Sequence, residues 1–170
     1  MTHDQGRQRV VIEGVQPEID GGIFPIKRTI GEEVVVEADA FADSHDALRI
    51  LLCCRSETAQ QWTEIPMTFL GNDRWRASFP VTKLGQWHYT ITGWVDRFAT
   101  WRRDLVKKVE AGQDLRVDLL VGATLIEEAA IRGTTKDRRI LMKCGKDLRS
   151  KEIPEKDRIH AALSVDAGRR

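Results

Sequence analysis

The sequence predicts a mainly β protein with some α-helix: an antiparallel, immunoglobulin-like β-sandwich followed by a small helical appendage. Up to Trp101, apolar and polar residues alternate in short runs, and turn residues separate these runs roughly every ten to fifteen positions, as in a sandwich. Beyond Trp101 the apolar residues recur at spacings of three and four, which is the period of a helix. We therefore expect a sandwich over residues 1–101 and a helical segment, an incomplete helical bundle, over residues 102–170.

The expected strands follow from alternation and from the turns between them. Val34 to Ala40 and Leu48 to Cys54 alternate most regularly, and Gly71-Asn-Asp73 is a turn signal before the next run. Pro66 marks an edge strand, because proline cannot donate to a ladder. Within the last run, alternation places Trp87 in the core and Trp94 on the outer face. The expected strands cover residues 10–15, 34–40, 48–54, 62–67, 75–79 and 86–96.

The helical part begins, on this pattern, with a turn around Leu105 to Val109 that Gly112 ends and after which Asp114 caps the next helix. A longer helix follows over residues 115–132, then a loop over residues 133–137 and a helix through Leu148. Pro154 starts a last short helix that ends near Leu163. Two or three amphipathic helices leave an apolar face that the sandwich, a second copy or further sequence has to cover.

Composition excludes several classes of function. The net charge of +1 gives no electrostatic case for binding nucleic acid or an anionic membrane. No apolar run approaches the roughly 20 residues that span a bilayer, and the polar N-terminus lacks the features of a secretory signal. The three cysteines form a poor disulfide framework and the four histidines have no metal-binding spacing. We expect a cytoplasmic protein with reduced thiols, no metal and no cofactor.

Four motifs carry a resemblance to a known family: Arg9 to Asp20, Phe24-Pro-Ile-Lys-Arg28, Gly71-Asn-Asp-Arg-Trp-Arg76 and Trp94 to Leu105. In this order and spacing they resemble the N-terminal, non-catalytic region of the bacterial α-1,4-glucan:maltose-1-phosphate maltosyltransferases. These are enzymes of the α-amylase superfamily, and the resemblance covers roughly residues 9–130. The match is thinner beyond Gly133.

The resemblance implies an enzyme with an N-terminal sandwich, a helical insertion, an α-amylase-type barrel and a C-terminal sandwich. Such enzymes transfer maltosyl units from α-maltose 1-phosphate to α-1,4-glucans with retention, which requires two carboxyl groups in the barrel. This sequence has no βα repeat, so no catalytic residue can be carried over, and we expect a truncated piece of a longer protein without transfer activity of its own. The resemblance implies packing on the barrel and dimerisation as its roles.

The candidate site residues lie at the junction between sandwich and helices. Exposed tryptophans suit a glucan because sugar C–H groups stack on the negative face of the ring, whereas buried ones would dock a helix or a neighbouring domain. We place Trp101 on a strand that returns from Trp94. Arginines here suit a phosphate, although neighbouring acids favour ion pairs. The residues proposed for glucan binding or for an interface are Trp94, Arg97, Phe98, Trp101, Arg102 and Arg103.

The apolar stripe of the long helix is the candidate subunit interface, through Leu119, Ala123 and Ile126. Our first interpretation is therefore a non-catalytic module that packs on the barrel and forms a homodimer. The alternatives are a sandwich that binds α-1,4-glucan and a free-standing regulatory protein that uses the same surface. Adjacent acids such as Glu127 and Glu128 diverge on a helix, so they do not form an acid/base pair.

Overall fold

A computed structural model describes residues 10–165, and it separates them into two compact units. The first unit ends at Val95 and the second begins at Asp96. The expected boundary after Trp101 therefore differs from the observed one, because the first helix begins at Arg97. The first residue of the Arg9 to Asp20 motif and the tail at residues 166–170 lie outside the described residues.

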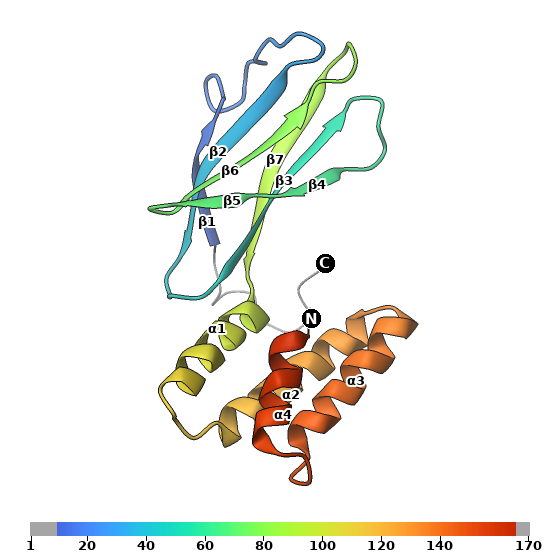
Figure 1. Ribbon diagram of the computed structural model, residues 1–170. Coiled ribbons are helices and arrows are strands. Elements are labelled where there is room, and N and C mark those ends of the chain that lie inside the picture. Colours follow the sequence, from blue (N-terminus) through green and yellow to red (C-terminus); the bar gives the residue numbers. More distant parts are fainter. Residues whose placement is uncertain (1–9, 166–170) are drawn as a thin grey trace, which may run out of the picture. The chain divides into compact units, whose positions relative to one another are not determined.

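The first unit is built from two antiparallel sheets, which confirms the predicted fold class (Figure 1). One sheet has the strand order β1-β2-β6-β5, and the other has the order β4-β3-β7. The strands are β1 (Val10–Gln16), β2 (Glu33–Ala42), β3 (Leu48–Ser56), β4 (Thr63–Pro66), β5 (Thr68–Gly71), β6 (Arg74–Pro80) and β7 (Trp87–Val95). Strand β4, which contains Pro66, is an edge strand as expected.

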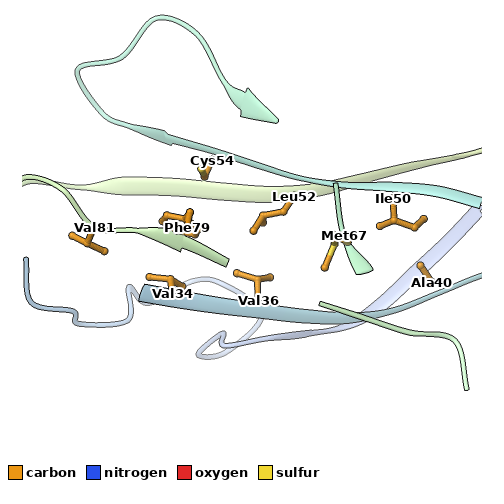
Figure 2. Packing of buried hydrophobic residues seen from close by; sticks show 9 residues of the cluster. All are labelled: Val34, Val36, Ala40, Ile50, Leu52, Cys54, Met67, Phe79 and Val81. Carbon is orange, nitrogen blue, oxygen red and sulfur yellow. The ribbon is translucent and has the colours of Figure 1, made fainter. Parts of the chain in front are cut away.

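The core of the sandwich lies between these sheets. Alternate residues of β2 and β3 point inward, so Val36 and Leu52 are both fully buried, and Phe79 of β6 lies beside Leu52 in the same layer (Figure 2). The inward residues of β7, namely Trp87, Tyr89 and Ile91, pack against this cluster, as alternation predicted. The nine buried residues of the cluster are Val34, Val36, Ala40, Ile50, Leu52, Cys54, Met67, Phe79 and Val81.

The turn between β5 and β6 has the chemistry that the sequence indicated. Gly71 pairs with Arg74, which leaves a two-residue loop of Asn72 and Asp73 with φ of 48° and 59°. Two positive φ values are typical of a type I′ hairpin, and Asn and Asp tolerate that region better than most residues. Strand β5 itself was not among the expected strands.

The second unit consists of four described helices: α1 (Arg97–Glu110), α2 (Arg116–Arg132), α3 (Thr135–Arg149) and α4 (Glu155–Ser164). Helix α1 starts ahead of the predicted turn, because the side chain of Asp96 accepts a 2.9 Å hydrogen bond from the Ala99 amide and caps the helix. Gly112 has φ of 62°, and its amide and that of Gln113 bond to the Val109 and Lys108 carbonyls. These bonds form the Schellman motif that ends α1.

The remaining helix boundaries are also set locally. Asp114 accepts a bond from the Arg116 amide, and the Arg116 guanidinium lowers the pKa of Asp114 to about 2. The expected loop over residues 133–137 is shorter in the structure, because Thr134 caps α3 directly after Gly133. Pro154 stands at the N-cap of α4, close to its predicted place.

A single buried cluster holds the four helices together. Trp101 of α1 is 7% exposed, and its indole N–H donates a 2.8 Å hydrogen bond to the Asp118 carbonyl of α2. The ring occupies a notch at Gly122, where an added Cβ would lie 1.9 Å from Cζ2 of Trp101. The buried members of this cluster are Trp101, Leu105, Leu115, Leu119, Ala123, Ile126, Cys144, Leu148 and Ala162.

We predict that Gly122→Ala destabilises the helical unit by about 1–3 kcal/mol, because the new methyl group overlaps the Trp101 ring and α1 has to move away. Thermal unfolding followed by circular dichroism measures this effect. Gly133→Ala is the matched control, because a Cβ there meets its nearest atoms at 3.5 Å and the backbone φ is −78°. Equal melting temperatures for the two variants would contradict the prediction.

Candidate functional site

The two tryptophans of the candidate platform have different environments. Trp94 lies on the outer face of β7 and is 38% exposed, as alternation predicted. Trp101 lies on α1 and is buried in the helical unit, so its expected place on a return strand is wrong. The sequence signal for the helix was Asp96, a favoured capping residue directly ahead of Arg97. A buried ring offers no face to a sugar, so Trp101 is a packing residue.

Phe98 also belongs to the packing of the helical unit. Its ring lies 5.4 Å from that of Trp101 and contacts the buried cluster. The arginines behave differently, since Arg97, Arg102 and Arg103 are exposed on α1. Arg103 pairs with Asp104 at 3.2 Å. The candidate group therefore splits into two aromatic residues that pack in the helical unit, Phe98 and Trp101, and the exposed Trp94 and arginines.

The C-terminal half of α1 is joined to α2 by an ion pair. Lys108 Nζ lies 2.6 Å from Asp118 Oδ1, and the Asp118 carbonyl accepts the Trp101 indole hydrogen. The acidic residues near these basic residues in the sequence favoured such an ion pair. The pair holds α1 on α2, and Lys108 binds a carboxylate in it rather than a phosphate.

The expected interface stripe on α2 is a core stripe. Leu119, Ala123 and Ile126 are each 0% exposed, because α1, α3 and α4 pack around them. The expectation that these three side chains meet a second subunit is therefore wrong. Helical periodicity identified the apolar face correctly, but the chain's own helices cover it.

The opposite face of α2 is the exposed apolar surface that sequence reasoning missed. Val117 is 71% exposed and Ile131 is 70% exposed, with Leu120 and Val121 at 47% each between them. Leu120 and Val121 follow Val117 by three and four residues, and Ile131 follows it by fourteen, which is close to four helical turns. These spacings place all four on one side of the helix, roughly opposite Leu119. The signal was present in the sequence, since apolar residues also occur on the side of α2 that carries Thr124 and Glu128. We call these four residues the outer face of α2.

A second exposed surface is the outer side of the β4-β3-β7 sheet. Trp94 pairs in register with Arg49, and Trp62, just before β4, is 40% exposed with the Arg55 guanidinium 4.6 Å from its ring centroid. These two arginines are six positions apart on β3, so the tryptophans stand roughly 20 Å apart along the strands. The exposed hydroxyls of Thr90 and Thr92 lie beside β3 between them. We call this surface the sheet platform.

The three cysteines are buried thiols without a disulfide among the described residues. Burial is the main cause that raises the pKa of Cys53, Cys54 and Cys144, so none is poised as a thiolate nucleophile. Cys54 belongs to the sandwich core, and Cys53 points to the other side of β3, as expected for adjacent strand residues. Residues 10–165 contain no cluster of histidine, cysteine and acidic side chains suited to a metal ion.

A row of charged side chains crosses the outer side of the β1-β2-β6-β5 sheet, and we call it the ladder. Glu37 of β2 accepts bonds from Arg74 at 3.1 Å and from Arg76 at 2.6 Å, and Arg74 also reaches Asp39 at 3.2 Å. The hydrogen bonds from Arg76 and then Arg74 lower the pKa of Glu37. These groups neutralise one another, so the ladder ties β2 to β6 rather than forming an acid/base pair.

None of the helices in the described range has the length and apolarity needed to cross a bilayer.

The described residues thus define a particular class of protein: an immunoglobulin-like sandwich joined in sequence to a four-helix unit. The family model for α-1,4-glucan:maltose-1-phosphate maltosyltransferase, domain N/S, matches residues 8–169. The chain belongs to this family.

Individual relatives agree with the family match. The chain is 51% identical to the α-1,4-glucan:maltose-1-phosphate maltosyltransferase of Chlorobaculum tepidum over 132 residues, which is 78% of this chain and 20% of the relative. It is 44% identical to the protein of the same name from Myxococcus xanthus over 165 residues, or 92% of this chain and 24% of the relative. The chain therefore spans about a fifth to a quarter of the length of these relatives.

We predict that Glu37 titrates below its ordinary pKa of 4.5 in the folded chain. A lowered folded pKa contributes stability at pH values above the unfolded pKa, and this contribution is lost as the pH falls through the lowered value. A carboxyl-detected NMR titration measures the midpoint. In the Arg76→Gln variant the midpoint should move back toward the ordinary value, and an unchanged midpoint would contradict the assigned cause.

Proposed function

We propose that this chain is the non-catalytic N-terminal module of a glucan-elongating maltosyltransferase, and that it serves in domain packing and dimerisation. The full enzyme would be a cytoplasmic member of the α-amylase superfamily that transfers maltosyl units from α-maltose 1-phosphate to α-1,4-glucans with retention. The family membership and the names of the relatives support this activity for the parent enzyme. The catalytic barrel would lie in the part of the enzyme outside this chain.

The outer face of α2 is the observation that carries the packing and dimerisation roles. Val117 and Ile131 are apolar and about 70% exposed at the two ends of the helix, and Leu120 and Val121 continue the surface between them. Exposed apolar side chains gathered on one side of a helix, here interrupted by Thr124 and Glu128, indicate a contact that is formed with another molecule or domain. A stripe on a helix suits a twofold contact, because two copies can lay the same face against each other. The buried candidates Leu119, Ala123 and Ile126 support this surface from beneath.

A glucan-binding module is the second candidate function, and the sheet platform favours it. Trp94 and Trp62 are each about 40% exposed at opposite ends of one sheet face, with threonine hydroxyls between them. Aromatic faces separated by hydrogen-bonding groups suit an extended α-1,4-linked chain, whose rings stack at intervals. The ligand would be an α-1,4-glucan. In this candidate function the second stacking residue beside Trp94 is Trp62, and not Trp101 as the sequence had suggested.

We predict that the chain dimerises through the outer face of α2. Sedimentation velocity should give about twice the 19.3 kDa monomer mass, and the double variant Val117→Glu, Ile131→Glu should sediment as a monomer. Buried like charges facing each other across a twofold contact cost several kcal/mol, which explains the expected loss. Leu84→Glu, at a position 86% exposed in the sandwich, is the control that should stay dimeric. A wild-type chain that remains monomeric at tens of micromolar would refute dimerisation by this module alone.

The glucan-binding candidate predicts a saturable change in tryptophan emission when maltoheptaose is added. Trp94→Ala and Trp62→Ala should each weaken binding about tenfold, which corresponds to the loss of one stacking contact of about 1.4 kcal/mol. Phe69→Ala is the control, since this aromatic ring is 53% exposed on β5, away from the sheet platform. A flat titration up to millimolar sugar would remove this candidate and leave the structural role.

A further inference from the structure

Arg55 of the sheet platform differs from the arginines of β6 in the contacts that hold it. Arg74 and Arg76 both bond to Glu37, and this carboxylate balances their charge. Arg55 forms no ion pair with any carboxylate in residues 10–165, and its Nε is buried without a hydrogen-bond partner. Its guanidinium lies instead over the ring of Trp62, 4.6 Å from the ring centroid. The sheet platform thus holds a positive charge in place without neutralising it.

Stacking on an aromatic ring orients a guanidinium but leaves its hydrogen-bond donors unused. The N–H groups point outward in the plane of the guanidinium, whereas the attraction to the ring acts through its face. A buried N–H of a charged group that lacks an acceptor costs free energy, and an incoming acceptor recovers this cost. Carboxylate and phosphate oxygens are the strongest acceptors for such a group, because both partners are charged.

The strands on both sides of β3 place further binding groups beside Arg55. On one side, the register that joins Cys54 to Thr63 leads to Trp62 at the next position. On the other side, His88 of β7 pairs with Arg55. Side chains that stand opposite each other on one face are about 5 Å apart. His88 is exposed, and its imidazole can donate a hydrogen bond, so an anion at Arg55 has a second donor within reach.

Two carboxylates near this end of β3 limit the size of the anion. Glu64 lies on the same face of β4, opposite Cys53, and the exposed Glu57 follows β3 in the turn. Neither pairs with Arg55 within the described residues. An extended polyanion such as a nucleic acid would cover these carboxylates and be repelled by them. A small anion that reaches only the guanidinium edge avoids this repulsion, so the surroundings favour a single phosphate or carboxylate group.

The exposed surface of Trp62 indicates which molecule carries that group. Trp62 is 40% exposed although the guanidinium lies over its ring, so aromatic surface remains for a ligand. Sugar C–H groups stack on such surface. The sheet platform continues from here to the exposed hydroxyls of Thr90 and Thr92, which suit the hydroxyl groups of a sugar. A ligand that joins a sugar ring to a phosphate group can contact the indole and the guanidinium together.

We propose that Arg55, Trp62 and His88 form a subsite of the sheet platform for the phosphate monoester of a sugar. The Arg55 guanidinium binds the phosphate group, His88 donates a further hydrogen bond to it, and the sugar ring lies against Trp62. The choice of a sugar rests on the glucan-binding candidate under the proposed function, whereas the choice of a phosphate rests on Arg55 alone. The subsite would let this module retain a phosphorylated sugar at a surface that carries out no chemistry on it.

The test compares α-maltose 1-phosphate with maltose, because these probes have the same sugar rings and differ in the phosphate group. The whole 170-residue chain is titrated with each probe, and NMR follows the Trp62 indole signal and the Arg55 Nε–H signal. We expect both signals to shift and α-maltose 1-phosphate to bind about tenfold more tightly than maltose, as one charge-assisted contact provides. This difference should shrink at high salt, because ions screen an exposed charge.

Three variants identify the group that binds the phosphate. Arg55→Gln should reduce the affinity for α-maltose 1-phosphate to that for maltose. Arg55→Lys keeps the charge but not the planar fork, so it should restore only part of the difference. Arg76→Gln is the matched control, because it removes the same charge from a side chain that is 53% exposed on the other sheet, and it should leave both affinities unchanged. Thermal unfolding checks that each variant is folded.

Equal affinities of the wild-type chain for the two sugars, or a preference for the phosphorylated sugar that survives in Arg55→Gln, would overturn the proposal. Inorganic phosphate that binds as tightly as α-maltose 1-phosphate would mean an adventitious ion only and would also overturn it. The maltoheptaose titration tests the glucan-binding candidate separately. Saturable binding of maltoheptaose without any preference for the phosphorylated sugar would keep that candidate and remove the subsite.

Discussion

The capping of α1 by Asp96 is the constraint on which the division of this chain depends. Until Val95 the chain is extended and buries alternate residues, and from Arg97 onward it is helical and buries every third or fourth residue. The Asp96 carboxylate satisfies an amide that would otherwise lack a partner in the first turn, so the change of period takes a single residue. Each unit then builds its own core, one around Phe79 and one around Leu119. The same early start of α1 ends the second sheet at β7.

Each unit buries one set of apolar residues and exposes another. In the helical unit the exposed set is the outer face of α2, and in the sandwich it is the segment that contains Ile23 and Phe24. Neither surface carries a metal cluster or an activated thiol within residues 10–165. The proposed packing role rests on these exposed apolar surfaces, and the chain spans 20–24% of the relatives from Chlorobaculum tepidum and Myxococcus xanthus.

Most of the sandwich was predictable because burial on one side imprints a period of two on the sequence. Val34 to Ala40 and Leu48 to Cys54 gave strands at nearly the observed bounds. Strand β5 was not predicted, because a strand of four residues at the edge of a sheet shows little alternation of apolar and polar residues, and Phe69 and Leu70 are both exposed. Trp101 was misplaced because a single aromatic residue has no period of its own, whereas the capping signal at Asp96 was readable.

The candidate interface could be predicted only in part, for a related reason. Periodicity finds an apolar stripe, but it does not say which partner covers the stripe. Leu119, Ala123 and Ile126 formed the more regular stripe, and α1, α3 and α4 cover it. The second stripe, through Val117 and Ile131, became visible only when the packing of the other helices was known. The sheet platform likewise needed the register between β3 and its neighbours, which places Trp94 and Trp62 on the same side of one sheet.

The Gly122 notch has a consequence for the uniqueness of the fold. A helix that is apolar on two sides has two orientations about its own axis that bury similar amounts of apolar surface, so hydrophobicity alone does not choose between them. Only the side that carries Gly122 and Ala123 has room for an indole ring, since a Cβ at residue 122 would overlap Trp101. On the other side, Leu120 and Val121 would hold the ring away. The shape of a single residue, rather than the amount of apolar surface, thus fixes which side of α2 is interior and selects one native arrangement over its rotated competitor.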